Sequence, residues 1–355
     1  MSSLSSPLDA LQNGHWFKLI CGASFQHLPA IRTLALVYTL AGADCIDVAA
    51  DPAVVYAARS GIKAAQNLLK ANESASASQV WLMVSLNDGE DPHFRKAIFD
   101  PQQCPTDCSR PCVSICPAEA IAFSPLQSGI IEDRCYGCGR CLPICPVGHI
   151  ETRSQPATTA AIQPLVSAEL VQALELHTQV GHEAEFQQLW QQVQPMLPYL
   201  KVLAVSCPDD EGVLEYLSVL YALMQPLPCP LIWQTDGRPM SGDIGDGATR
   251  ATIKYGERVL RSQLPGFVQL AGGTNRHTVP KLKARVLLRD HATTRNPSLE
   301  YISGVAYGSY ARSLVMEIQT QLEAQPQSTY KIEDYPTLLY SAVDLVAQLI
   351  SPLKC

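Results

Sequence analysis

CPTDCSRPCVSICP at residues 104–117 and CYGCGRCLPICP at residues 135–146 hold eight of the 13 cysteines in this chain of 355 residues. The second stretch has the spacing C-x2-C-x2-C-x3-C-P, which is the bacterial ferredoxin signature for [4Fe-4S] clusters. Gly137 and Gly139 allow the backbone to wrap closely around a cluster, and Pro146 keeps the fourth cysteine from folding back onto it. The stretch therefore predicts a ferredoxin-like segment that binds iron and sulfur.

The first stretch is a wider copy of the second, with the spacing C-x3-C-x3-C-x3-C-P. Cys112 and Cys141, Cys116 and Cys145, and Ile121 and Ile150 are each separated by 29 positions, so the segment contains an internal repeat. In two-cluster ferredoxins the fourth cysteine of each stretch binds the other cluster. We therefore predict cluster one on Cys104, Cys108, Cys112 and Cys145, and cluster two on Cys135, Cys138, Cys141 and Cys116.

Two other uses of these thiols stay open. Structural zinc sites also use four thiolates, but they favour paired C-x2-C knuckles separated by a longer loop. If Cys104 or Cys108 is not a ligand, the first site instead holds a three-iron or labile cluster. Four of the scattered cysteines are expected to be small buried residues, and Cys355 is expected to be exposed. These four are Cys21, Cys45, Cys207 and Cys229.

Composition excludes several classes of protein. With 47 % hydrophobic and 17 % charged residues, the chain has enough apolar side chains for a core. The 26 Lys and Arg against 33 Asp and Glu argue against a nucleic-acid binder. The first ten residues lack the basic start and apolar segment of a signal peptide, and no clean apolar run of about 20 residues predicts a membrane span. We expect a cytoplasmic protein, where disulfides are disfavoured.

Outside the cysteine-rich segment, short apolar strands alternate with longer helical patterns. This order is typical of a parallel sheet covered by helices. Eight such units predict a (β/α)8 barrel, with an open doubly wound sheet as the alternative. The strand candidates are residues 18–22, 45–50, 80–87, 173–178, 201–207, 231–237, 267–273 and 301–308; the helix candidates are 28–41, 53–69, 183–193, 211–224, 250–263 and 309–323.

The predicted domains follow from this order. Residues 1–96 and 153–325 form the two parts of the barrel, residues 97–152 are a ferredoxin-like insertion after the third strand, and residues 326–355 are a helical extension. An insertion there lies on the face where the active sites of such barrels are built.

Polar and glycine residues follow several of the predicted strands. The turns at 271–275 and 306–309 follow the last two strands, where many barrels bind a phosphate, so Gly272, Gly273 and Gly308 are candidates for a phosphate or flavin (FMN) site. We assign no catalytic residue. The other polar residues expected at the barrel mouth are Ser24, His27, Asp47, Asp51, Asn87, Asp88, Asp236, Arg238, Asn275 and Arg276.

Residues 276–295 carry six basic residues against one acid, Asp290. We interpret this stretch as a solvent-exposed face, with a docking surface for an acidic electron carrier as the alternative. The six are Arg276, Lys281, Lys283, Arg285, Arg289 and Arg295.

The stretch HWFKLICGASFQHLPAIRTLALVYTLAGADCIDVAADP at residues 15–52, joined to the double cysteine motif, resembles the cyanobacterial light-dependent period family. The resemblance covers essentially the whole chain. It implies a redox-responsive iron–sulfur protein of circadian input that tunes clock period with light. It also implies clock input and oscillator proteins as partners, and no known catalytic reaction.

Together these observations predict a redox sensor or electron relay with two [4Fe-4S] clusters. Two alternatives remain, because the chain has no obvious catalytic triad or nucleotide loop. One is a flavin-dependent oxidoreductase whose clusters deliver electrons to the barrel. The other is an interaction scaffold in which the clusters are structural.

Overall fold

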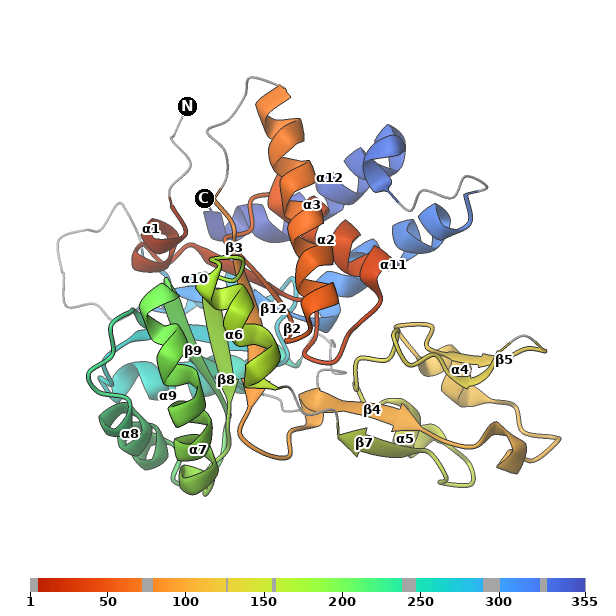
Figure 1. The fold of residues 1–355 in the computed structure, drawn as a ribbon, viewed down its shortest axis with the longest axis horizontal. Coiled ribbons are helices and arrows are strands. Elements are labelled where there is room, and N and C mark those ends of the chain that lie inside the picture. The colour runs from red at the N-terminus through yellow and green to blue at the C-terminus, as the bar shows by residue number, and fades with distance from the viewer. Residues whose placement is uncertain are drawn as a thin grey trace.

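Eight parallel strands close into a barrel in the computed structural model, which describes residues 6–71, 79–125, 127–154, 158–237, 247–289, 301–325 and 331–354. Figure 1 shows the barrel with its helices on the outside and the cysteine-rich segment projecting to one side. Around the barrel the strand order is β1, β12, β11, β10, β9, β8, β3, β2. The strands are β1 (Trp16–Ile20), β2 (Cys45–Ala49), β3 (Trp81–Asn87), β8 (Ala173–His177), β9 (Val202–Pro208), β10 (Leu231–Asp236), β11 (Phe267–Ala271) and β12 (Gly304–Tyr307).

Each of the eight predicted strands is present, and the barrel is confirmed over the open sheet. The decisive contact is that β1 pairs on both of its edges. Lys18 is in register with Ala306 of β12 on one side and with Cys45 of β2 on the other. The first and last strands therefore meet, which an open doubly wound sheet does not allow.

Helices cover the outside of the barrel wherever the sequence predicts them. The α2·α3 pair packs closely because Gly61 has no side chain: a Cβ there would lie 2.2 Å from the backbone oxygen of Arg32. The helices are α1 (Pro7–Gln12), α2 (Leu28–Leu40), α3 (Pro52–Ala71), α6 (Thr159–Ser167), α7 (Glu183–Val193), α8 (Val213–Leu223), α9 (Thr249–Arg261), α10 (Thr278–Ala284), α11 (Ser309–Glu323) and α12 (Pro336–Lys354), with the 3-10 turns η3 (Gln194–Tyr199) and η5 (Ile332–Asp334).

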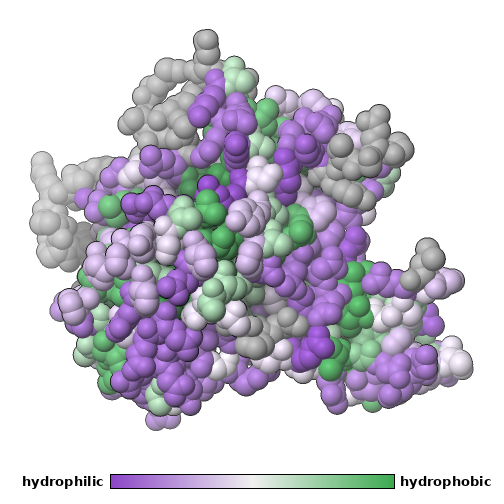
Figure 2. Space-filling model, in the orientation of Figure 1, coloured by the Kyte–Doolittle hydropathy of each residue, from purple (hydrophilic) through white to green (hydrophobic). Residues whose placement is uncertain are grey.

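The last helix, α12, is long and apolar enough by composition to cross a membrane. In the structure it packs against α11, α2 and β1, burying one face that includes Leu339, Val346 and Ile350. Its final lysine, Lys354, forms an ion pair with Asp44 of the barrel at 2.5 Å. α12 therefore packs on the barrel through one face of the helix. On the outer surface, Figure 2 shows hydrophilic residues over most of one face and hydrophobic residues in small patches.

Inside the barrel, apolar side chains fill the end where the strands begin, and polar side chains fill the end where they finish. Trp16, Met83 and Ile232 belong to the apolar group. One step further along the strands lies a buried hydrogen-bonded chain. The Trp16 indole donates to Gln269, the Gln269 amide donates to Gln234, and the Gln234 amide donates to Glu175 at 2.7 Å.

Glu175 lies at the centre of a buried group of charges. The Lys18 ammonium donates to Glu175 and lies 3.4 Å from Asp47. Burial alone would lower the pKa of Lys18, but these two carboxylates outweigh it and raise the pKa. Burial raises the pKa of Asp47 to about 6. A charged lysine is therefore fixed inside the barrel by the acids around it.

The cysteine-rich insertion lies between β3 and β8. Two antiparallel strands, β4 and β7, form its base, and its two halves extend away from the barrel (Figure 1). Its elements are η1 (Pro92–Phe94), β4 (Arg95–Ile98), η2 (Pro101–Gln103), α4 (Pro111–Ile115), β5 (Ile121–Phe123), β6 (Ser128–Ile130), α5 (Cys141–Ile144) and β7 (Glu151–Ser154).

Ion pairs hold the start of the insertion onto the barrel. The Asp91 carboxylate lies 2.9 Å from Nδ1 of His93 and 3.3 Å from Nδ1 of His177. Nε2 of His177 lies 3.0 Å from Glu175, and Nε2 of His93 lies 3.4 Å from Asp236. Alternating carboxylates and imidazoles therefore run from the barrel interior to the insertion.

This chain of charges predicts a pH-dependent stability. Burial alone would lower the pKa of His177, but Asp91 and Glu175 outweigh it and raise the pKa to about 10 from 6.5. Protonated His177 therefore contributes its full stabilisation of the fold below pH 6.5. That contribution is lost as the pH rises through about 10 and the imidazole loses its proton. We expect His177→Gln to lower the free energy of unfolding by about 3 kcal/mol near pH 6, and by much less near pH 10.

Anaerobic denaturant unfolding of the wild type and His177→Gln at several pH values measures this difference. Asp91→Asn is the matched background, because it removes one of the carboxylates that raise the pKa of His177. In that background the effect of His177→Gln should shrink. A difference between the two proteins that stays constant across the pH range would contradict the interpretation.

Candidate iron–sulfur centre and barrel mouth

The two halves of the insertion present their cysteines in the same way. In each half a short helix carries the third cysteine of its run and ends at the fourth. Cys112 lies in α4 and Cys116 caps its C-terminus, while Cys141 begins α5 and Cys145 caps its C-terminus. One helical turn between the third and fourth cysteines allows their thiols to serve different sites.

Electrostatic contacts sort the eight thiols into two sets. Besides burial, the thiols of Cys108 and Cys145 raise the pKa of Cys104, and those of Cys145 and Cys104 raise the pKa of Cys112. We call Cys104, Cys108, Cys112 and Cys145 the first thiol set. Its fourth member comes from the second sequence run.

The other four thiols form the second thiol set, Cys116, Cys135, Cys138 and Cys141. Burial raises the pKa of Cys116, and Cys138 and Cys135 add to the shift. For Cys141, burial together with Cys138, Cys135 and Cys116 raises the pKa to about 12. The fourth cysteine of each run thus lies near cysteines of the other run: Cys116 near Cys135, Cys138 and Cys141, and Cys145 near Cys104 and Cys112.

Backbone N–H groups point at the sulfurs. The Cys116 and Cys135 sulfurs accept hydrogen bonds from the backbone of Ala120 at 3.3 Å and Ala97 at 3.4 Å. Burial alone would raise the pKa of Cys145, but the backbone N–H groups of residues 147–150 outweigh it and lower the pKa. Hydrogen bonds of this kind stabilise thiolates, which are the form that binds metal.

The spacing of the thiols fits a group larger than one ion. In a tetrahedral zinc site, Zn–S bonds of about 2.3 Å place neighbouring sulfurs about 3.8 Å apart. A zinc site needs at least three ligand atoms close together. Among the described residues, one such group has its ligand atoms within 4.8 Å of one another, Asp91, His93 and His177, and it contains no thiol. The four members of the second thiol set instead line one hollow within the insertion. The thiol positions therefore favour a cluster over a single zinc ion.

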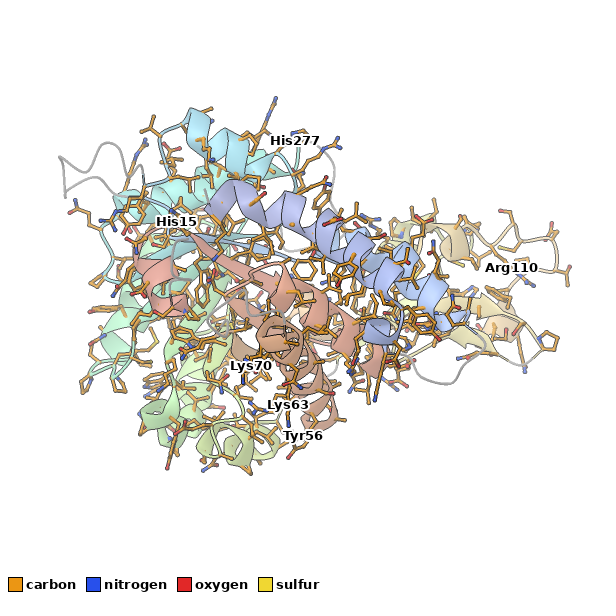
Figure 3. All side chains as sticks on the ribbon, turned by 90° about the horizontal axis from the view of Figure 1, so that it is seen from above. His15, Tyr56, Lys63, Lys70, Arg110 and His277 are labelled. Carbon is orange, nitrogen blue, oxygen red and sulfur yellow. The ribbon has the colours of Figure 1, made fainter. Side chains whose placement is uncertain are left out.

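The two sets differ in their surroundings. The first set lies among exposed residues at the outer end of the insertion, where Figure 3 places Arg110. The second set lies nearer the barrel, and Cys135 and Cys141 are buried. Gly137 allows this loop to dock, because a Cβ there would lie 2.2 Å from the backbone oxygen of Arg95.

Tyr136, between two thiols of the second set, packs against the barrel. Its ring meets Phe25 edge to face, with centroids 5.9 Å apart, and the Arg312 guanidinium lies 4.0 Å from its centre. Nearby, the buried Lys96 ammonium donates to Gln26 at 2.7 Å and to the backbone oxygen of Glu132 at 2.6 Å. Cys135 is also close enough to raise the pKa of Lys96, although burial lowers it overall.

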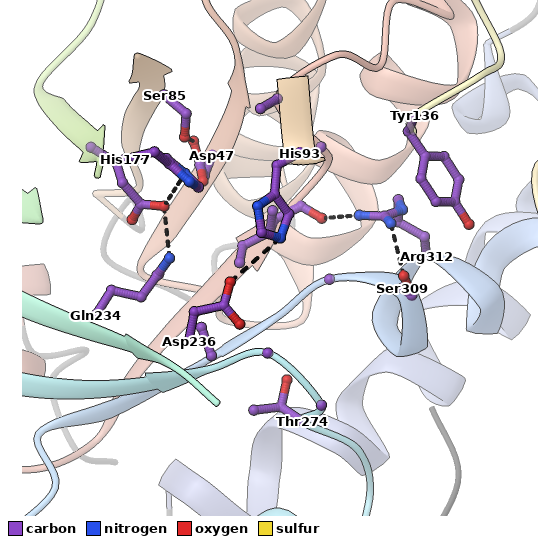
Figure 4. Close-up of a pocket in the computed structure, with 18 of the residues that line it drawn as sticks. Asp47, Ser85, His93, Tyr136, His177, Gln234, Asp236, Thr274, Ser309 and Arg312 are labelled. Carbon is purple, nitrogen blue, oxygen red and sulfur yellow. Dashed lines mark hydrogen bonds and ion pairs between the residues drawn. The ribbon is translucent and has the colours of Figure 1, made fainter. Parts of the chain in front are cut away.

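The mouth of the barrel contains the other predicted site. Gly272, Gly273 and Gly308 line one hollow, together with Tyr136 and Arg312. Figure 4 shows Arg312 and Ser309 on one side of it and His93 and Asp236 on another. The structure therefore brings the three predicted glycines together. It also adds residues that the sequence analysis did not assign to the site, among them Tyr136, Arg312, Ser309 and His93.

Most other predicted mouth residues have structural roles. The Ser24 hydroxyl lies 3.2 Å from the backbone oxygens of His93 and Arg95, joining the barrel to the insertion. Asp51 accepts from the first amides of α3 as predicted for a helix cap. The remaining residues contact neighbours: His27 pairs with Glu323, Asp88 with His182, Asp47 with Ser85, Asn87 with Gly89 and Arg276 with His277, and Asn275 accepts from His277; Arg238 lies outside the described residues.

The described part of the basic stretch is largely a solvent-exposed face, as interpreted, since Arg276, Lys283, Arg285 and Arg289 are exposed. Several of its side chains also bond to the barrel. Lys281 donates to Thr249, Arg285 to Glu257, and Arg289 to the backbone oxygen of Gln12. Asp290 and Arg295 lie outside the described residues. Of the scattered cysteines, Cys21, Cys45 and Cys207 are buried as predicted and Cys229 is half-buried, whereas Cys355 lies outside the described residues.

Sequence reasoning missed the charges inside the barrel. Lys18, Glu175 and His177 each interrupt an apolar strand, and Glu175 and His177 are two positions apart. That spacing directs both side chains to one face of a strand. A charged residue in an otherwise apolar strand could have predicted a side chain that points into the barrel.

Two family models match separate parts of the chain. Residues 165–352 match the family model described as the light dependent period A C-terminal domain, and residues 104–156 match the one described as the LdpA Fe-S cluster-binding domain. Light dependent period A of Synechococcus elongatus is 51 % identical over 352 residues, which are 99 % of this chain and 95 % of that protein.

Two further similarities are more limited. An iron-sulfur protein of Rhodospirillum rubrum is 38 % identical over 55 residues, covering 16 % of this chain and 29 % of that protein. Two crystal structures of tryptophan synthase from M. tuberculosis align over 98 % and 99 % of this chain and 100 % and 99 % of theirs, with 12 % identity and TM-scores of 0.42 and 0.43. Because the Synechococcus protein is similar over nearly the whole of both chains and both family models match, the chain belongs to the light dependent period A family of iron–sulfur proteins.

Proposed function

We propose that this chain holds two [4Fe-4S] clusters with exchanged fourth ligands and uses them to sense the redox state of the cell. The first thiol set would hold cluster one and the second thiol set cluster two. The observation that carries the proposal is the second set, whose loop packs through Tyr136 onto the mouth of the barrel. A change of charge there acts directly on barrel residues.

When bound, each cluster takes up and releases one electron at a potential that its surroundings set. The chain supplies those surroundings through N–H···S hydrogen bonds, burial and nearby charge. The first set has three half-buried thiols and lies among exposed residues, which suits it to exchange electrons with a carrier. The second set lies against the barrel, next to the cations Lys96 and Arg312. This order favours electron entry at the outer end and a response at the barrel.

Membership of the family links this redox response to light-dependent circadian period. We propose clock input and oscillator proteins as the partners that read it, and the cytoplasm as the place where they meet. The flavin alternative stays a prediction, since the comparisons name iron–sulfur proteins and no flavin. A scaffold with structural clusters differs in one outcome: its binding to partners would not change when the clusters are reduced.

Removing the fourth cysteine of each run tests the exchanged ligands. Cys145→Ser should disturb cluster one, although Cys145 follows the three cysteines assigned to cluster two. Cys116→Ser should disturb cluster two. Each variant should lose up to half of the iron, because a serine oxygen is a poorer ligand for iron–sulfur clusters than a thiolate. Iron analysis and electron paramagnetic resonance (EPR) of anaerobically purified protein measure the loss.

Cys229→Ser is the matched control, because that thiol is half-buried and lies outside both sets. It should keep all iron. Pairing Cys145→Ser with Cys141→Ser identifies the lost cluster, because the two variants should remove different EPR signals. If both variants removed the same signal, the exchange of ligands would be wrong.

Lys96 should raise the potential of cluster two. Its buried ammonium lies close to Cys135, and a nearby positive charge favours the reduced, more negative cluster. We expect Lys96→Gln to lower the potential of cluster two by about 60 mV, a tenfold change for one electron, and to leave cluster one nearly unchanged. An EPR-monitored redox titration measures both potentials.

Lys63→Gln is the control for the loss of a lysine. Lys63 lies on the outer helix α3, and Figure 3 shows this residue on the barrel, away from the insertion. The titration of this variant should match the wild type. Equal shifts of both clusters in Lys96→Gln would contradict a local effect of this ammonium. An unchanged titration would mean that Lys96 only packs the insertion.

A further inference from the structure

Arg312 is a buried cation that pairs with no described carboxylate. It lies in the first turn of α11 and its side chain is 4 % exposed. Its guanidinium donates to the backbone oxygen of Ile20 at 2.8 Å and to the Ser309 hydroxyl at 3.1 Å, and its Nε has no hydrogen-bond partner. Burial of a charge without a counter-charge is costly, so this position calls for an anion.

The other cations around the same hollow already have carboxylate partners. Lys18 pairs with Glu175 and Asp47, and His177 and His93 share Asp91. The acids of the mouth are therefore largely neutralised by these groups. Arg312 differs from them because its partners are neutral.

The surroundings of Arg312 fit a phosphate group. Gly272 and Gly273 follow β11 with positive φ angles of 65° and 91°, and Gly308 follows β12. A Cβ on Gly308 would lie 3.6 Å from the nearer guanidinium nitrogen, so the glycine leaves that side of Arg312 open. No side chain caps the N-terminus of α11, whose 15 residues direct a partial positive charge at the hollow.

The hollow has a cavity volume of about 60 Å³ and opens to solvent, so a ligand held there has room to extend out of it. We propose that it binds the phosphate group of a small molecule, with Arg312 as the counter-charge and the glycine turns after β11 and β12 as the cradle. The rest of the molecule would extend toward His93 and Asp236, which line the same hollow.

Arg312 also connects this site to the second thiol set. Its guanidinium lies over the Tyr136 ring, and its charge lowers the pKa of Cys138, although burial raises that pKa overall. This step rests on the proposed function, because it requires cluster two. Reduction would place one more negative charge beside Arg312 and weaken phosphate binding. By linkage, bound phosphate lowers the potential of cluster two.

The experiment is calorimetric titration of the anaerobic, cluster-loaded protein with inorganic phosphate and with glycerol 3-phosphate, at constant ionic strength. Acetate is the third ligand, and it tests whether the site binds a carboxylate as well as a phosphate. We expect both phosphates to bind and acetate to bind much more weakly. Arg312→Gln should weaken phosphate binding ~10-fold or more, and reduction with dithionite should weaken it about fivefold in the wild type.

Gly308→Ala is the second variant, because it adds a methyl group beside Arg312 while leaving the guanidinium in place. It should also weaken phosphate binding. Arg285→Gln, which removes an exposed arginine bonded to Glu257, should bind like the wild type. Iron content, measured on the same samples, reports the clusters separately. Cluster-loaded protein that binds no phosphate, or an Arg312→Gln variant that binds it normally, would overturn this proposal and leave the proposed function standing. Protein without iron would overturn the proposed function instead.

Discussion

Asp91 is the residue on which the arrangement of this molecule depends most. Its carboxylate joins His93 at the start of the insertion to His177 at the end of β8. Both imidazoles have a raised pKa because the acids around them outweigh the effect of burial. Without Asp91, the two imidazoles would lose the carboxylate that they share, and the insertion would lose a charged connection to the barrel. The position of the second thiol set follows from this contact.

The sequence predicted the fold well and the chemistry of the mouth only in part. Apolar strands such as 173–178 identified the barrel because both faces of a barrel strand are buried. The cysteine spacing predicted the two thiol sets, and the glycines predicted the turns after β11 and β12. Arg312 could not be found in this way, because an arginine in an amphipathic helix is usually exposed. Its burial results from contacts with Ile20 and Tyr136, which are far away in the sequence.

In the proposed function, electrons enter at one thiol set and have their effect at the other. The first thiol set lies among exposed residues at the outer end of the insertion, and the loop of the second set reaches the barrel mouth through Tyr136. The Tyr136 ring and the Arg312 guanidinium form one contact between the second set and the barrel. A charge added at this point has few neighbours to screen it, since the surrounding groups are buried. The barrel thus provides a rigid base on which a small electrostatic change can be read.

The most direct test is EPR spectroscopy of the anaerobically purified wild-type protein after full reduction, combined with iron and sulfide analysis. Thiol sets that share the short helices α4 and α5 place two clusters close together. We expect about eight irons and eight sulfides per chain, four of each per cluster, and a spectrum broadened by spin coupling between neighbouring reduced clusters. Bound zinc in place of iron, or the signal of one isolated cluster, would contradict the account.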